Sequence, residues 1–227
     1  MSGVEQVQEP PRTPSFAMLR TLGGVAMMAG LLVVLVFQVT KPIIEENKRI
    51  AIEKAVFRVV PGAASRKDFV LGAEGLLPAA EAQAGGETIY AAYDAQGALL
   101  GVAMEAAATG YQDVIRILYG YNPACECVTG IKVLKMAETP GLGDKIAFDP
   151  EFLKNFEALD ARLAPGRDGL LNEIVAVKHG NKTAPWQVDS ISGATISSKA
   201  IARMINQSGQ RMFPLIMRHL DRLRAGG

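Results

Sequence analysis

The sequence predicts an α+β protein, with one N-terminal transmembrane helix followed by a domain of antiparallel strands and flanking helices. Three observations predict this class. Residues 18–40 are almost uninterruptedly apolar, residues 88–136 contain β-branched and aromatic runs separated by turn residues, and apolar residues recur at helical spacing after residue 198. A chain of 227 residues divides naturally into one membrane anchor and one medium-sized domain.

The apolar stretch is the first predicted element. Residues 22–39 carry no charged side chain and, with the apolar residues just before them, approach the ~20 residues that cross a bilayer as a helix. A helix that is apolar all round does not suit the core of a domain of this size. A cleaved signal peptide is a second alternative, but the small-x-small pattern of a cleavage site is missing. We therefore expect an uncleaved anchor at residues 18–40, after a polar tail at residues 1–17.

A connecting region follows the anchor. Residues 42–60 alternate apolar and charged side chains at roughly helical spacing, with a proline near the start and Pro61-Gly62 at the end, which predicts a helix. Residues 63–87 are rich in Ala and Gly, and we expect a loop with short structured pieces. The predicted organisation is therefore a connecting helix and loop at residues 41–85 and the main domain at residues 86–227.

The β region is the clearest part of the domain. Runs rich in Val, Ile, Thr and aromatic residues alternate with turn residues such as Asp94, Gly97 and Asn122-Pro123. This pattern predicts antiparallel hairpins with strands at residues 88–93, 99–107, 114–121 and 128–136. Tyr111, just before the third strand, either packs near a ligand or fills the core.

Helical signals dominate the rest of the domain. Asp149-Pro150 is typical of an N-cap and first helical residue, which predicts a helix at residues 150–161, and residues 174–178 form one more short strand. In the last part of the chain, Ser197 or Ser198 is the expected N-cap of an amphipathic helix.

Two residues interrupt this last helical pattern. Gly209 and Pro214 lie within it, and we expect them to bend the helix or split it in two.

Composition excludes several functions. The net charge of +1 implies no nucleic-acid partner, and the only histidines, His179 and His219, are too far apart in sequence to suggest a metal site or triad. The chain has no nucleotide-binding glycine fingerprint and no iron–sulfur cysteine set, and the centre of its anchor is apolar. By itself it should neither oxidise NADH nor pump an ion.

The only cysteines form a Cys-x-Cys pair at Cys125 and Cys127. This spacing is shorter than that of zinc Cys-x-x-Cys pairs, and no second ligand pair completes a tetrahedral site. Two interpretations stay open: small residues at a hairpin turn, or a redox-active or bridging pair at a contact between subunits.

Residues 189–198 are a compact run of hydroxyl and small residues before the last helix. A helix N-terminus offers free N–H groups and a positive dipole end, which together can hold a phosphate. Gly193 and Ala194 leave the backbone bare, so that a bulky group can approach the Thr195 hydroxyl. The alternative is a serine-rich helix cap with no further function.

This run resembles the flavinylation motif of FMN-binding domains. The resemblance rests on Ser192-Gly193-Ala194-Thr195, with Asp189 upstream and Ser197 downstream. In that family the last threonine of the motif carries FMN through a phosphoester bond, which a dedicated flavin transferase forms from FAD. The resemblance therefore implies covalent FMN on Thr195, and it places Asp189, Ser192, Gly193 and Ala194 in the same cofactor site.

Residues 138–145 resemble a second signature of the same family, one that lies against the flavin. The resemblance implies that Glu138 and Thr139 make polar contacts and Leu142 an apolar contact with the ring. Gly141 and Gly143 permit backbone conformations that are closed to other residues. The alternative is an ordinary loop before a helix.

Taken with the membrane segment, the resemblance extends to the RnfG family of the Rnf ion-translocating electron transport complexes. It implies an electron carrier in a membrane complex that transfers electrons between ferredoxin and NAD and couples the transfer to ion translocation. The implied partners are the other subunits of the complex, the flavin transferase and the membrane. The implied location is the bacterial inner membrane, crossed once, with a cytoplasmic tail and a periplasmic FMN domain.

Charge around the anchor does not favour this orientation. Arg12 and Arg20 precede the anchor, whereas Lys41, Lys48 and Arg49 follow it. Rival functions also remain: the related NqrC component of a sodium-pumping NADH:quinone reductase (Nqr), a stand-alone membrane-anchored flavoprotein, or, from another class, a structural interaction module without flavin.

Overall fold

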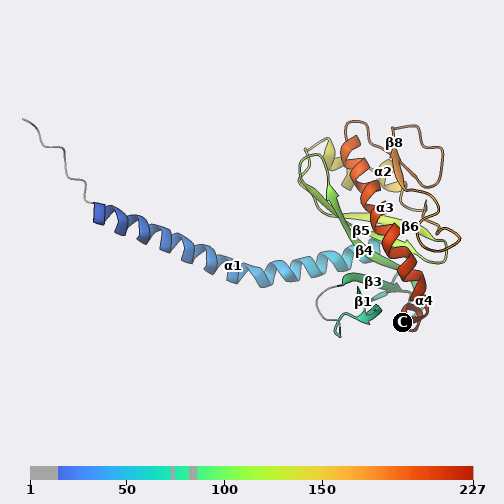
Figure 1. Ribbon diagram of the computed structural model, residues 1–227, viewed down its shortest axis with the longest axis horizontal. Coiled ribbons are helices and arrows are strands. Elements are labelled where there is room, and N and C mark those ends of the chain that lie inside the picture. Colours follow the sequence, from blue (N-terminus) through green and yellow to red (C-terminus); the bar gives the residue numbers. More distant parts are fainter. Residues whose placement is uncertain (1–14, 73–74, 82–85, 227) are drawn as a thin grey trace, which may run out of the picture. The chain divides into compact units, whose positions relative to one another are not determined.

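The computed structural model describes residues 15–72, 75–81 and 86–226, and the chain divides into two compact units, Met1–Arg49 and Ile50–Gly227. Helix α1, Ser15–Val59, makes up the described part of the first unit and contributes residues 50–59 to the second (Figure 1). The predicted anchor and connecting helix are thus one continuous helix with Pro42 inside it. Most of the predicted tail lies outside the described residues, and its last residues, 15–17, are helical.

In the first unit, α1 contains a window that is long and apolar enough to cross a membrane, and no residue of that window is buried. Its apolar side chains, among them Leu31, Val34 and Phe37, are exposed. Transfer of such side chains from water into a bilayer lowers the free energy of the system. Length and composition therefore agree with the predicted anchor.

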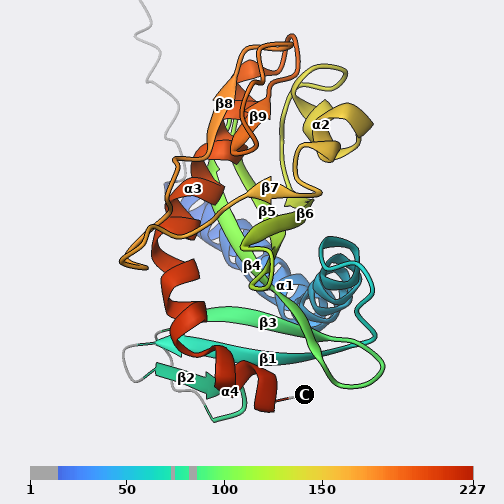
Figure 2. The ribbon, with the colours of Figure 1, turned by 90° about the vertical axis from the view of Figure 1, so that its right-hand side faces the viewer.

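The second unit is built on a seven-stranded sheet in the order β2-β1-β3-β4-β5-β6-β7, in which every pairing is antiparallel (Figure 2). The strands are β1 Ser65–Gly72, β2 Gly75–Pro78, β3 Glu87–Tyr93, β4 Leu99–Thr109, β5 Val114–Asn122, β6 Cys127–Lys135 and β7 Leu159–Asp160. The four predicted strands are confirmed as β3 to β6. The predicted fold class, an antiparallel sheet with flanking helices, is also confirmed.

Strands β1 and β2 were not predicted as strands. The sequence predicted a loop with short structured pieces at residues 63–87, and these pieces are β1 and β2, which extend the sheet beyond β3. Only Phe69 and Leu71 of β1 are buried, and its other side chains are charged, small or half-exposed, so its alternation is weak. Pairing with β3, rather than local pattern, makes this segment a strand.

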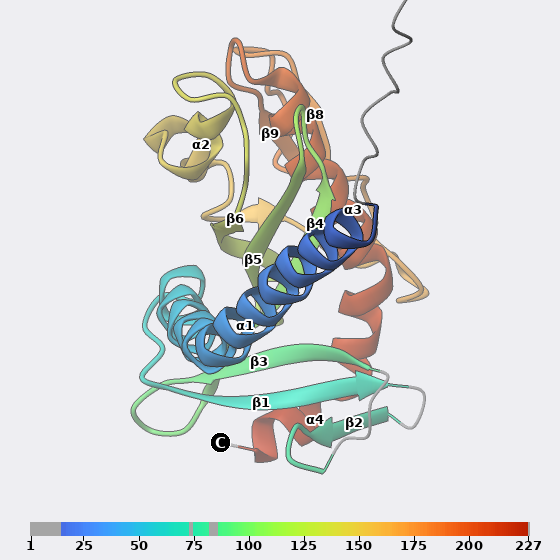
Figure 3. The ribbon, with the colours of Figure 1, turned by 90° about the vertical axis from the view of Figure 1, so that its left-hand side faces the viewer.

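Helices cover both faces of the sheet (Figure 3). Residues 50–59 of α1 pack on one face against side chains such as Leu118. Helix α3, Thr195–Arg218, packs on the other face against side chains such as Ile117 and Tyr119. Because successive side chains of a strand point to opposite faces, β5 supplies both cores, which explains its continuous apolar run.

The C-terminal helix continues further than predicted. Helix α3 passes through both Gly209 and Pro214, and the break comes only at His219, before α4, Leu220–Ala225. A Cβ atom at Gly209 would lie 2.7 Å from the ring of Phe213, so the glycine makes room for a core side chain. The predicted split at these residues is therefore wrong.

The segment between the sheet and α3 contains the 3₁₀ helix η1, Gly143–Ala147, the helix α2, Pro150–Lys154, and the parallel pair β8, Val175–Val177, and β9, Gln187–Asp189. The N-cap at Asp149 is confirmed, since its carboxylate accepts from Phe152 N at 3.1 Å. The expected strand near residues 174–178 is confirmed as β8.

The predicted helix at residues 150–161 is wrong after Lys154. The Asn155 amide donates to the carbonyl of Phe152 at 3.0 Å, and its oxygen accepts from Asp189 N at 3.0 Å. These bonds end the helix and tie it to β9, a partner that local sequence cannot reveal.

The two cysteines form a disulfide, Cys125–Cys127, at the turn between β5 and β6. Their predicted place at a hairpin turn is confirmed, and neither thiol is free. A redox-active role or a place at a contact between subunits stays a prediction.

Close packing at Gly120 gives a testable prediction. A Cβ atom there would overlap the carbonyl oxygen of Val59 and lie 2.5 Å from Thr129 Oγ1, at the place where that hydroxyl donates to the same carbonyl. We expect Gly120→Ala to lower the free energy of unfolding by about 1–3 kcal/mol. Gly130→Ala is the control, because its Cβ would lie 3.3 Å from the nearest atom of Val59. Denaturant unfolding of the detergent-solubilised proteins measures both, and equal losses would contradict the prediction.

Candidate functional site

A cavity of about 390 Å³ brings together the two motifs that the sequence singled out. Segment 138–143 forms one wall and segment 193–197 the other, although residues 144–192 lie between them in the chain. The cavity is lined by Tyr111, Glu138, Thr139, Leu142, Gly143, Gly193, Ala194, Thr195, Ile196 and Ser197. Six of the eight predicted site residues therefore lie at one place, and only Asp189 and Ser192 are absent from this lining.

Thr195 is the first residue of α3, and its side chain is exposed. Ala194 is the N-cap and cannot satisfy the first helical N–H groups with a side chain. The predicted N-cap at Ser197 or Ser198 is wrong, since the helix begins earlier. The Ser198 hydroxyl instead donates to Ala194 O at 2.9 Å and accepts from Ile191 N at 3.2 Å, which closes the turn before the helix.

Glycines set the backbone on both walls. Gly193 has φ +85° and Gly141 has φ +77°, values in the left-handed region that favours glycine. A Cβ atom at Gly193 would lie 3.4 Å from Leu142 Cδ2, so the two motifs touch here. The Thr195 hydroxyl is therefore presented beside bare backbone at the uncapped end of a long helix.

Glu138 connects the two walls of the cavity through hydrogen bonds. It is 7% exposed, and its carboxylate accepts from Tyr111 N at 3.0 Å and from Ser197 Oγ at 2.5 Å. Leu142, Tyr111 and Ile196, which are about half-exposed or more, surround the cavity with apolar surface. An apolar rim next to polar groups suits a flat aromatic ligand with a polar end.

Several lining residues were missed or left open by the sequence. Tyr111 does not fill the core, because its side chain is 66% exposed. Ile196, which immediately follows the motif, was missed, whereas Ser197 was named with the motif but not as a residue that lines the cavity. Trp186 is half-buried and does not line this cavity.

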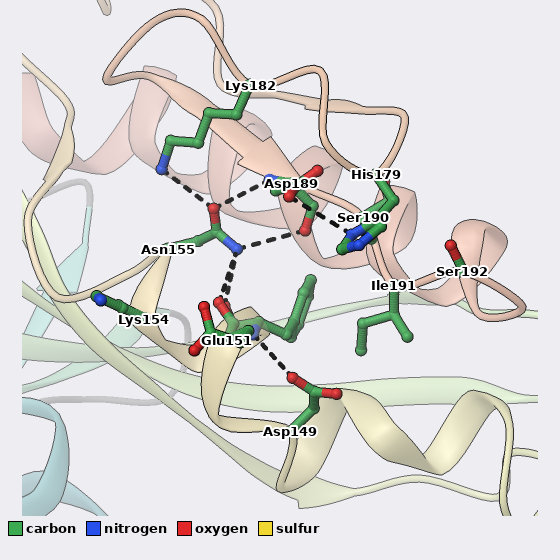
Figure 4. Close-up of a pocket in the computed structure, with 11 residues that line it drawn as sticks. Asp149, Glu151, Lys154, Asn155, His179, Lys182, Asp189, Ser190, Ile191 and Ser192 are labelled. Carbon is green, nitrogen blue, oxygen red and sulfur yellow. Dashed lines mark hydrogen bonds and ion pairs between the residues drawn. The ribbon is translucent and has the colours of Figure 1, made fainter.

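Asp189 and Ser192 line a second, larger cavity of about 790 Å³ (Figure 4). Asp189 ends β9, where one carboxylate oxygen accepts from Gly180 N at 2.8 Å and the other lies 3.5 Å from His179 Nδ1. Nearby, Lys182 donates to Asn155 Oδ1 at 3.1 Å, and burial lowers the pKa of its ammonium group. Asp189 therefore holds the loop that leads to the motif and does not reach the cavity beside Thr195.

Residues 110–209 match the family model of the FMN-binding domain. This range contains both motifs and every residue that lines the cavity, so the part of the chain that builds the candidate site is the part that resembles an FMN-binding domain.

The chain is also similar to curated G subunits of ion-translocating oxidoreductase complexes. The chain is 36% identical over 119 residues to the G subunit of an ion-translocating oxidoreductase complex from Methanosarcina acetivorans, which covers 52% of this chain and 55% of the relative. It is 32% identical over 102 residues to the G subunit of the Na⁺-translocating ferredoxin:NAD⁺ oxidoreductase complex from Acetobacterium woodii, over 45% and 44% of the two chains. The predicted resemblance to the RnfG family is therefore confirmed.

Coverage differs between relatives. The chain spans about half the length of the first curated relatives that it matches. A longer match, 26% identical, covers 81% of this chain and 82% of the G subunit from Shewanella piezotolerans. Among solved structures, NqrC of Shewanella oneidensis has a TM-score of 0.60 at 16% identity, with 79% of this chain and 99% of that chain covered. This likeness shows the fold of the domain.

Proposed function

We propose that this chain is a membrane-anchored flavoprotein that carries FMN covalently on Thr195 and relays electrons as one component of an Rnf-type complex. In such a complex, electron transfer between ferredoxin and NAD drives ion translocation. One observation carries the proposal: the two motifs meet at one cavity, at the start of α3. The names of the RnfG relatives support the rest.

The cavity has the features that FMN needs. Its volume of about 390 Å³ falls in the range of small-molecule sites, about 300–1,000 Å³. Its apolar rim suits the isoalloxazine ring, and the uncapped N–H groups of α3 suit the phosphate. Bound FMN would supply reversible electron transfer, and the residues that line the cavity would hold and orient it.

Exposure distinguishes Thr195 from the other hydroxyls of the motif. Ser190, Ser197 and Ser198 are buried, and Ser192 lines the other cavity. Thr195 alone combines an exposed hydroxyl with a place in the cavity between the motifs. A flavin transferase therefore has access to this hydroxyl for phosphoester formation.

Denaturing gel electrophoresis tests the proposal. When the chain is co-expressed with a flavin transferase, we expect a band that fluoresces under ultraviolet light, because only a covalent flavin survives denaturation. Tryptic peptides should carry the mass of one FMN, less one water, on Thr195. A band without flavin would favour the structural interaction module instead.

The likeness to NqrC favours a second candidate, a component of an Nqr-type complex. Purified complex distinguishes the two: ferredoxin:NAD oxidoreductase activity supports the Rnf assignment, and NADH:quinone reductase activity supports the alternative.

We also propose that the FMN domain lies on the periplasmic side of a bacterial inner membrane. The disulfide supports this orientation, since disulfides persist outside the reducing cytosol. We expect an impermeant maleimide to label Glu157→Cys in intact spheroplasts, because this residue is exposed and the native cysteines are paired. A cysteine replacing Ser15, at the N-terminal end of α1, is the control and should react only after lysis. The reverse pattern would overturn the orientation.

Gly141 tests whether the 138–143 turn contacts the flavin. A side chain there meets no atom within 4 Å, but φ +77° strains a β-branched residue. We expect Gly141→Val to keep covalent FMN and to shift its visible spectrum. Gly180→Val is the control, with φ +78° and equally open space away from the cavity. Identical spectra in both variants would exclude the turn from the flavin site.

A further inference from the structure

Glu138 accepts hydrogen bonds from two other segments that line or flank the cavity beside Thr195. One carboxylate oxygen accepts from Tyr111 N at 3.0 Å and Gln112 N at 3.2 Å, and the other accepts from Ser197 Oγ at 2.5 Å. The first two donors belong to the loop between β4 and β5, and the third lies in the first turn of α3. One buried side chain thus joins three segments that surround the cavity.

The packing around this carboxylate leaves no room for larger neighbours. A Cβ atom at Gly110 would overlap Oε1 of Glu138, and a Cβ atom at Gly143 would lie 2.7 Å from Oε2. The carboxylate therefore occupies a slot between two glycines. Such a fixed group can set the shape of the cavity but cannot turn to follow a ligand.

The Glu138 carboxylate takes part in none of the salt bridges found between residues 15–72, 75–81 and 86–226. Its partners are neutral donors, and it lines the cavity although its side chain is buried. A carboxylate in this place makes the potential in the cavity more negative, because burial weakens the screening by water.

We propose that Glu138 is a positioning residue with an electrostatic role, and not a ligand of the flavin. It holds the 110–112 loop and the first turn of α3 against the 138–143 turn. Its charge also lowers the midpoint potential of the flavin, because electrons added to the ring are repelled by a nearby negative charge. The second statement rests on the proposed function, whereas the first concerns the chain alone.

Hydrogen exchange tests the positioning role in the full chain, produced without a flavin transferase. We expect the backbone amides of Tyr111 and Gln112 to exchange at least about tenfold faster in Glu138→Ala, since a hydrogen bond to a charged acceptor is lost. Glu126→Ala is the matched control. The Glu126 carboxylate accepts from Leu163 N at 2.8 Å, so its loss should speed exchange there and not at residues 111–112. Unchanged exchange at residues 111–112 in Glu138→Ala would overturn the positioning role.

Redox titration of the flavin-loaded protein tests the electrostatic role. Glu138→Gln keeps the size of the side chain and removes its charge, so we expect a more positive midpoint potential than in wild type. Glu126→Gln should leave the potential unchanged, because Glu126 does not line the cavity. Equal potentials in Glu138→Gln and Glu126→Gln would overturn the electrostatic role. A wild-type chain that takes up no flavin would overturn the proposed function, and the exchange experiment would still decide the positioning role.

Discussion

Replacing Thr195 by alanine should abolish covalent flavin completely. The change removes the hydroxyl that forms the phosphoester, and it removes little packing because the side chain is exposed. Alanine is also well tolerated at the start of a helix, so the fold and the anchor should persist. The measurement is ultraviolet fluorescence of the denatured band, with circular dichroism to establish that the variant is folded.

Two further variants make this experiment specific. Thr195→Ser keeps a hydroxyl at the same place and should be modified in part. Ser192→Ala removes the other exposed hydroxyl of the motif, which lines the other cavity, and should keep full fluorescence. Flavin retained in Thr195→Ala, or lost in Ser192→Ala instead, would overturn the assignment.

Replacing Phe213 by alanine should destabilise the domain more than any other change considered. Phe213 is fully buried on α3, and its ring stacks on Tyr121 of β5 with centroids 3.9 Å apart and an angle of 9°. Truncating a buried phenylalanine costs about 3–5 kcal/mol, through lost burial and the cavity that remains. Denaturant unfolding of the detergent-solubilised protein should therefore show a midpoint far below that of wild type.

Phe148→Ala is the matched control for this prediction. Its ring is 59% exposed, so the same truncation should change the free energy of unfolding by less than about 0.5 kcal/mol. Similar losses in the two variants would contradict the packing of α3 against β5.

The β3 to β6 meander could be predicted because its residues have strong local signals. Each strand has β-branched or aromatic runs, and each turn has Gly, Pro, Asn or Asp at the positions that chain reversal requires. The same is true of the apolar N-terminal helix and of the Asp149 N-cap, whose signals lie within the segments themselves.

Elements that depend on distant partners were predicted less well. Strand β1 forms because β3 is beside it, α2 ends because Asn155 bonds to β9, and α3 continues through Pro214 because the surrounding core supports it. A proline removes one helical hydrogen bond, and burial of the α3 face on the sheet offsets that loss.

The candidate site divides in the same way. The sequence by itself determined which motifs it contains: a threonine in a flavinylation-like motif and a glycine-rich turn with Glu138. Only the tertiary structure decided that the two motifs share one cavity, that Asp189 and Ser192 face another, and that Glu138 bonds to Tyr111 and Ser197. The physical reason is that a motif can be recognised from residues that are neighbours in the chain. Residues 138 and 195, in contrast, come close together only because α3 packs onto the sheet.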